Sequence, residues 1–246
     1  MNKKTLRILN KSLNIVITIV LLLCASYSIY CLWDNFQFYQ AGLDLKVQLR
    51  NIKPKGKKPS FEELRKINPD VAAWITLDGT KIDEPIVQGK NNEEYLNKDV
   101  YGKYYMGGTV FLDSRCDRKF QDVYSLIYGH HMEKHLMFGD LDLYKKKEFI
   151  QKHHTGVFMI PGKNYKVRIF ASLNIVASDP YIFNTDKYTE DANGFLQYVE
   201  NKAIWADEKQ IEKLRTDMGA YHILALTTCS SDDPEDRIAV LAMYKN

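Results

Sequence analysis

The 246-residue sequence contains little cysteine, and its positive and negative charges almost balance. It has 4 cysteines, and 34 lysines and arginines stand against 31 aspartates and glutamates, for a formal net charge of +3. A nucleic-acid-binding domain normally carries a strongly basic face, so this balance argues against a nucleic-acid partner. The sequence also lacks internal repeats and low-complexity tracts. Its 45% hydrophobic and 12% aromatic content instead predicts a folded body with one sizeable core.

An uncharged apolar stretch near the N-terminus predicts a membrane anchor. Residues 13–33 contain no charged side chain, and about 20 residues of helix span a hydrocarbon layer of about 30 Å. Residues 1–12 carry lysine and arginine but no acid, which holds that end in the cytoplasm. We therefore predict a single-pass protein of the cell membrane, with lipid around its helix and an extracellular body. A cleaved signal peptide is the alternative, although the apolar run is long for one.

The rest of the chain divides into a short helical segment and a β-rich body. Residues 34–69 hold an amphipathic helix, a basic linker and a further short helix. Residues 70–246 contain seven or eight short β-prone runs, with helices expected over 141–153 and, twice, within 192–214. Because regular βαβ alternation is missing, this pattern favours a closed or nearly closed β-barrel over a parallel sheet.

Only two cysteines, Cys116 and Cys229, lie outside the apolar segment. A disulfide between them is the usual expectation for an exported protein. Cys229, however, ends the apolar run 222–228 and is followed by an acidic loop, a context that suits chemistry better. A thiol is a useful nucleophile only as the thiolate, and it needs a nearby cation or base.

Arg237 is a candidate for the cation. It opens the next β-prone run, and pairing of the two runs as a hairpin would bring it beside Cys229. There it could stabilise the thiolate or donate to the oxyanion of a tetrahedral intermediate. The alternative is a surface arginine that neutralises the acidic loop, and spacing alone leaves both open.

A histidine is the expected base. His130 directly follows the strand-ending pair Tyr128–Gly129, where a small residue lets an imidazole stand over a cleft. His131 and His135 have the i, i+4 spacing of a helical zinc pair, but no acidic third ligand stands at a recognisable offset, so zinc is the weaker interpretation. The remaining histidines end a lysine-rich helix or lie in an apolar strand.

Three separated motifs carry a family resemblance. Residues 127–132 (IYGHHM), residues 226–229 (LTTC) and the following Arg237, in this order behind an anchor, resemble the sortases. Residues 70–96 and 107–113 are similar to the first strands of class B sortases, and the resemblance covers roughly residues 60–245. One departure concerns the cysteine strand, which in the family usually reads Thr-Leu-x-Thr-Cys. Ala225 stands where the first Thr would be, which touches substrate preference more than activity.

The resemblance implies an eight-stranded sortase β-barrel over residues 70–246 and the transpeptidation of Gram-positive cell-wall anchoring. Cys229 would attack a threonine carbonyl in the C-terminal sorting signal of a secreted protein and form a thioacyl intermediate. An amine from a peptidoglycan precursor or cross-bridge would then capture it. His130 would protonate the leaving amine, and Arg237 would hold the oxyanion. No cofactor and no metal are implied.

Four further residues near predicted strand ends are candidates for substrate binding: Tyr104, Ser125, Tyr128 and Thr228. Two other functions stay open. One is a membrane-anchored cysteine endopeptidase that only hydrolyses peptides, and the other is a non-enzymatic surface-binding module in which Cys229 is structural. Papain-like proteases place the cysteine before the histidine, whereas here the histidine comes first.

Overall fold

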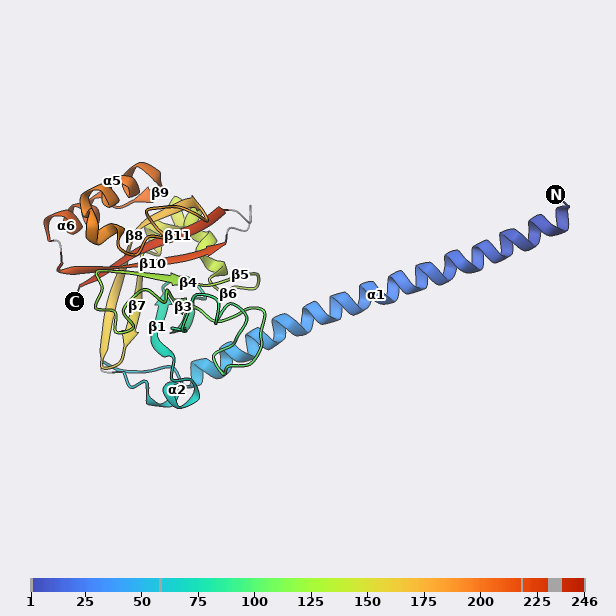
Figure 1. The fold of residues 1–246 in the computed structure, drawn as a ribbon, viewed down its shortest axis with the longest axis horizontal. Coiled ribbons are helices and arrows are strands. Elements are labelled where there is room, and N and C mark those ends of the chain that lie inside the picture. The colour runs from blue at the N-terminus through green and yellow to red at the C-terminus, as the bar shows by residue number, and fades with distance from the viewer. Residues whose placement is uncertain (1, 58, 218, 230–235, 246) are drawn as a thin grey trace. The chain divides into compact units, whose positions relative to one another are not determined.

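The structure is a computed structural model that describes residues 2–57, 59–217, 219–229 and 236–245 (Figure 1). The chain divides into two compact units, Met1–Leu45 and Lys46–Asn246. Helix α1 (Lys3–Asn51) begins in the first unit and ends in the second. Among the described residues it is the one helix long and apolar enough to cross a membrane, so it is a candidate membrane span.

The second unit is built on a β-barrel. Its sheet has the strand order β11-β10-β4-β3-β2-β1-β7-β8-β9, and β11 also pairs with β8, so the first eight strands close into a ring. The described strands of this sheet are β1 (Val71–Leu77), β2 (Asp83–Val87), β3 (Phe111–Leu112), β4 (Tyr124–Tyr128), β7 (Thr155–Ile160), β8 (Lys163–Val176), β9 (Ala203–Ala206), β10 (Tyr221–Cys229) and β11 (Asp236–Lys245). The closed barrel predicted from the sequence is confirmed, with β9 as an extra strand on the edge of β8.

Helices and one hairpin fill the connections. They are α2 (Glu62–Ile67), the hairpin β5 (His131–Met132) and β6 (Leu136–Met137), the 3₁₀ helix η1 (Gly139–Lys145), α3 (Lys147–Lys152), α4 (Lys187–Glu190), α5 (Ala192–Lys202) and α6 (Glu208–Thr216). The two helices predicted within 192–214 are confirmed, and α5 packs against β8 and β9 (Figure 1). The helix predicted over 141–153 is instead η1 followed by α3, because Lys146 between them has an extended backbone.

Large side chains on four of the barrel strands are buried. Trp74 of β1, Phe158 of β7, Phe170 of β8 and Tyr124 of β4 are all buried. Such burial supplies the main driving force for folding. The packed strands also hold side chains at their ends in fixed positions.

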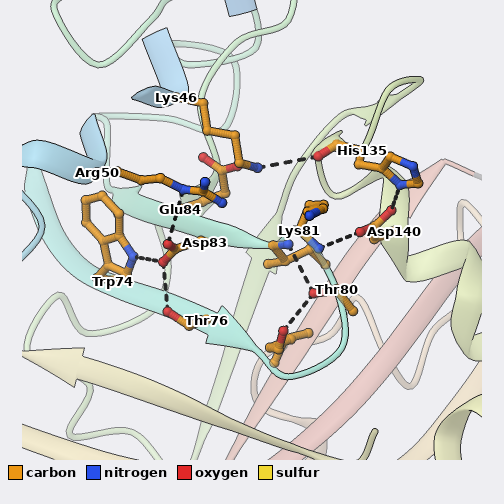
Figure 2. Close-up of polar contacts among 12 residues, drawn as sticks. Lys46, Arg50, Trp74, Thr76, Thr80, Lys81, Asp83, Glu84, His135 and Asp140 are labelled. Atoms are coloured by element: carbon orange, nitrogen blue, oxygen red, sulfur yellow. Dashed lines mark hydrogen bonds and ion pairs between the residues drawn. The ribbon is translucent and has the colours of Figure 1, made fainter. Parts of the chain in front are cut away.

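The last turns of α1 belong to the barrel unit, and Lys46 in these turns and Lys53 just after the helix both pair with β2. Lys46 Nζ lies 2.5 Å from Glu84 Oε1, and Lys53 Nζ lies 2.5 Å from Asp83 Oδ1. Arg50 adds a longer contact of 3.6 Å to Asp83 (Figure 2). The ion pairs fasten residues 46–53 to the first half of the barrel.

Candidate active site

Strand register brings the main chains of three predicted catalytic residues to one edge of the barrel. β10 runs parallel to β4, and Thr227↔Tyr128 is the last pair of their ladder. Cys229 and His130 each lie two residues beyond this pair, on neighbouring chains. β11 runs antiparallel to β10 with Cys229 opposite Arg237. The hairpin that the sequence suggested for β10 and β11 is confirmed, whereas the roles of these residues remain predictions.

A cavity of about 400 Å³ opens at this edge. The described residues that line it are Asn92, Leu96, Phe111, Tyr128, Gly129, His130, Ala177, Phe183, Thr227, Thr228 and Arg237. The cavity therefore contains two of the three predicted catalytic side chains and two of the four substrate-binding candidates. Its lining is largely apolar with a few polar groups, the usual make-up of a binding pocket.

His130 is held by the turn that follows β4. Its backbone carbonyl accepts a hydrogen bond of 3.1 Å from the amide of Phe138, and a Cβ on Gly129 would come within 2.7 Å of the Phe138 ring. A glycine is therefore required before His130. The ring Nε2 lies 2.7 Å from the carbonyl oxygen of Leu96. Because a carbonyl only accepts, Nε2 carries hydrogen and donates, which leaves Nδ1 as the nitrogen that can exchange a proton.

Arg237 lies on β11, which is hydrogen-bonded to a neighbouring strand on each side and is not an edge strand. Its strand pairs with β10 on one side and, through Ile175, with β8 on the other. The side chain is half-buried, lines the cavity and donates from Nη1 to the Asp236 carbonyl at 3.0 Å. A guanidinium stays charged at any physiological pH, so the cavity holds a permanent positive charge beside the position of Cys229.

The other two substrate-binding candidates lie away from this cavity. Tyr104 is 76% exposed in the loop before β3, and Ser125 is buried within β4; neither is among the described residues that line the cavity. Thr228, by contrast, lines the cavity, and its Oγ1 is buried without a hydrogen-bond partner in the described part of the chain.

The alternatives for cysteine and histidine are also resolved by the geometry. Cys116 is a free thiol, so the disulfide with Cys229 is wrong, and burial raises the pKa of Cys116 to about 11. His131 lies in β5, and His135 has a left-handed backbone with φ of 62°, so they do not form a helical pair. Each faces an aspartate instead, Asp142 at 3.1 Å and Asp140 at 2.5 Å. Within the described ranges no group of three or more potential metal ligands is found.

Sequence reasoning missed most of the cavity wall. Asn92 and Leu96 come from the segment between β2 and β3, and Ala177 and Phe183 from the segment after β8. Such connecting segments carry no hydrophobic period, so nothing in the pattern marks them. Only the register of the strands at their bases brings them to one place.

Comparisons with known proteins agree with this fold. No protein-family model matches the chain. The sortase B of Staphylococcus aureus is 30% identical over 187 residues, which is 75% of this chain and 74% of that protein. The crystal structure of Spy0129, a Streptococcus pyogenes class B sortase involved in pilus biogenesis, matches with a TM-score of 0.67 and 39% identity, covering 75% of this chain and 97% of that one. The S. aureus sortase B–substrate complex matches with a TM-score of 0.66 and 27% identity, covering 86% and 95%.

These similarities, on a barrel of this topology, define a cysteine transpeptidase of the sortase type. Within that group the chain belongs to the class B sortases.

Proposed function

We propose that this chain cleaves a C-terminal sorting signal after threonine and joins the protein to a cell-wall peptide amine. Cys229, His130 and Arg237 would carry the reaction. The observation that supports this most directly is the strand register, with Cys229 opposite Arg237 and both Cys229 and His130 just beyond the last β4–β10 pair. The family and the cavity at this edge add to that support.

The chemistry follows from the three side chains. The Cys229 thiolate attacks the threonine carbonyl carbon, and a C–S bond forms as the carbonyl oxygen becomes an oxyanion. Arg237 donates hydrogen bonds to that oxygen, where a charged donor in a partly dry cavity is effective. The C–N bond then breaks, and the imidazolium of His130 gives its Nδ1 proton to the leaving amine. The product is a thioacyl-enzyme.

The second half reverses these steps with a different amine. The amine of a peptidoglycan precursor or cross-bridge attacks the thioacyl carbon, His130 accepts its proton, and the thiolate leaves. The new peptide bond joins the surface protein to the wall. Neither half of the reaction calls for a cofactor.

The N-terminal segment suits this function. As a retained single-pass anchor with a cytoplasmic N-terminus, α1 would hold the barrel at the outer face of the membrane. Both substrates would lie in the same thin layer, so tethering raises the effective concentration of enzyme and substrate.

The test uses the full chain in detergent micelles and fluorogenic peptides with Asn-Pro-x-Thr, Ser/Pro-Pro-x-Thr and Leu-Pro-x-Thr cores. Each peptide is run with and without a glycine-rich amine, for the native chain and for Cys229→Ala. We expect cleavage after threonine and ligation to the amine, with both lost in Cys229→Ala. Cleavage that never yields ligated product would favour the endopeptidase. No cleavage of any peptide, together with no reaction of Cys229 with iodoacetamide, would favour the binding module.

A further inference from the structure

A buried carboxylate lies directly behind the cavity wall. Asp113 follows β3 and has no exposed surface. Its Oδ1 accepts from the backbone and from Nε of Arg115, each at 2.9 Å. Its Oδ2 accepts from Arg115 Nη2 at 2.7 Å, Asn92 Nδ2 at 2.9 Å and the Tyr128 hydroxyl at 2.9 Å. Five donors thus converge on one side chain that does not itself line the cavity.

Two of these donors belong to cavity-lining residues. Asn92 gives one amide hydrogen to Asp113, and its Oδ1 accepts from the backbone of Ser114 at 2.7 Å. An ionised carboxylate only accepts, so the amide cannot flip without losing both bonds. Toward the cavity Asn92 can therefore offer its remaining N–H, which is a donor. Tyr128 is oriented by the same oxygen through its hydroxyl.

Arg115 extends the network to a second cavity-lining segment, the one that carries Phe183. The Arg115 guanidinium forms a bidentate ion pair with Asp113. Its Nη2 also donates to the carbonyl of Phe183 at 3.0 Å. The Phe183 ring stacks on Tyr128, with ring centres 6.3 Å apart and planes 1° from parallel. A single ion pair therefore connects the segment after β2, strand β4 and the segment after β8.

Other hydrogen bonds also hold the segment that carries Phe183, including one from the Phe183 amide to the Asp179 carbonyl at 3.2 Å. The Tyr124 hydroxyl donates to the Ile182 carbonyl at 2.7 Å, and Asp179 accepts from the amides of Tyr181 and Ile182. These contacts fix the segment up to the Phe183 amide. Arg115 adds the hydrogen bond that joins the Phe183 carbonyl to a guanidinium held by the same carboxylate as Asn92.

Electrostatics supports a permanently ionised Asp113. Burial alone would raise the pKa of this carboxyl, but the hydrogen bonds from Arg115 and Tyr128 outweigh it and hold the pKa below its ordinary value. The same pairing raises the pKa of the Arg115 guanidinium. The Asp113–Arg115 pair, here called the bracket, therefore stays ionised at physiological pH and does not act as a pH switch.

We propose that Asp113 and Arg115 are positioning residues that hold the two walls of the substrate cavity at a set separation, with Asn92 turned so that it presents a donor to a peptide acceptor. This inference rests on the proposed function and adds to it two residues that do not touch the reacting atoms. Because a preformed cavity spares the enzyme the ordering of its loops on binding, loss of the bracket acts on substrate capture. The reactivity of the nucleophile stays the same.

Arg115 allows a test that does not endanger folding, since its side chain is 52% exposed. Arg115→Ala, Arg115→Lys and Asp113→Asn are compared with the native chain in detergent, with Arg118→Ala as the matched control. Arg118 lies three residues further on, contacts Asp70 and the Pro69 carbonyl, and does not line the cavity. The substrate is the peptide of the panel that the native chain cleaves fastest.

For Arg115→Ala we expect KM to rise roughly tenfold, the scale of one lost charge-assisted hydrogen bond, with kcat held within about twofold. The rate at which iodoacetamide alkylates Cys229 should not change. Arg115→Lys should resemble Arg115→Ala, because an ammonium cannot reach both Asp113 and Phe183 with a planar fork. Asp113→Asn should show the same defect, and Arg118→Ala should behave as the native chain.

Amide hydrogen exchange tests the bracket without turnover. Exchange should become severalfold faster within residues 177–186 in Arg115→Ala, and within both 88–97 and 177–186 in Asp113→Asn, while Arg118→Ala changes neither. Three results would each overturn the proposal. They are a native KM in Arg115→Lys, equal falls in kcat and in the rate of Cys229 alkylation in Arg115→Ala, and amide exchange that is unchanged in Arg115→Ala and Asp113→Asn. A native chain that cleaves no peptide would instead overturn the proposed function, and the exchange result would still decide on the bracket.

Discussion

Two buried carboxylates stand at opposite ends of neighbouring strands, and their surroundings differ sharply. β2 and β3 are parallel, with Val87 paired to Phe111. Glu84, near the start of β2, is 4% exposed and has, in the described part of the chain, one close donor, Lys46 Nζ at 2.5 Å (Figure 2). Asp113, just after β3, has no exposed surface and five donors.

The same burial has opposite outcomes at the two sites. At Glu84, burial raises the pKa, and the Lys46 ammonium offsets only part of that effect. At Asp113, burial acts in the same direction, but the donors from Arg115 and Tyr128 overcome it and the pKa is lowered. The number of hydrogen bonds to the charged form therefore decides whether the pKa of a buried carboxyl is raised or lowered. Asp113 accepts five such bonds, whereas Glu84 depends on Lys46.

That dependence connects the end of α1 with the hairpin after His130. Lys46 Nζ also donates to the His135 carbonyl at 3.4 Å, between β5 and β6. His135 in turn faces Asp140, which accepts from the backbone of Lys81 at 2.6 Å (Figure 2). Glu84 is thus linked through Lys46 to the hairpin that follows His130, whereas Asp113 is linked to the cavity-lining residues Asn92 and Tyr128.

Removal of Lys46, the close donor to Glu84, should give the largest loss in the free energy of unfolding. In Lys46→Met the side-chain volume is kept, but Glu84 becomes a buried charge without its partner, which costs about 3–5 kcal/mol. Urea denaturation of the full chain in detergent, followed by tryptophan fluorescence, measures this loss. In Lys46→Met/Glu84→Gln no charge is left behind, so most of the loss should be recovered. A double variant as unstable as the single one would show that the packing of α1 matters and the ion pair does not.

The opposite pKa shifts should appear as opposite pH dependences. Asp113 has a lowered pKa when folded, so its contribution is present above its unfolded-state pKa of about 3.9 and is lost as pH falls through the folded value. Glu84 has a raised pKa, so its contribution is present below about 4.3 and is lost as pH rises through the folded value.

The measurement is the free energy of unfolding from about pH 3 to pH 7 for the native chain, Asp113→Asn and Glu84→Gln. The advantage of the native chain over Asp113→Asn should shrink on acidification. Relative to Glu84→Gln, the native chain should lose stability as pH rises. Parallel curves for both variants would contradict the distinction between the two sites.

Much of this molecule was predictable from its sequence, but neither carboxylate was. The barrel followed from short β-prone runs such as 222–228, and the β10–β11 hairpin from the spacing of Cys229 and Arg237, because both depend on local patterns. Asp113 and Glu84 look like ordinary acids beside strands. Arg115 is a local partner of Asp113, but the other donors, Asn92 and Tyr128 for Asp113 and Lys46 for Glu84, come from distant parts of the chain, and no local period encodes such contacts.

A smaller effect should follow removal of one of the five donors at Asp113. Tyr128→Phe keeps the ring that stacks on Phe183 and deletes only the hydroxyl. Because four donors remain, we expect a loss of about 1.5 kcal/mol in the free energy of unfolding, and a rise in the pKa of Asp113 relative to the native chain. The same urea titration measures the first effect. A loss as large as that of Lys46→Met would mean that the donors at Asp113 act as one indivisible unit.

The smallest effect belongs to Arg50, which makes an outlying contact with Asp83 on the α1 side. Its side chain is 48% exposed, and its Nε is 3.6 Å from Asp83 Oδ2. Burial would raise the pKa of Asp83, yet Lys53 and Trp74 hold it below its ordinary value. Asp83 is therefore satisfied without Arg50, and Arg50→Ala should cost about 0.5 kcal/mol or less, a loss that added salt largely removes. Lys53→Ala should cost more, since that lysine is 21% exposed and lies 2.5 Å from Asp83. Equal stability of the two alanine variants would show that distance and burial do not determine how much Arg50 and Lys53 each contribute to stability through Asp83.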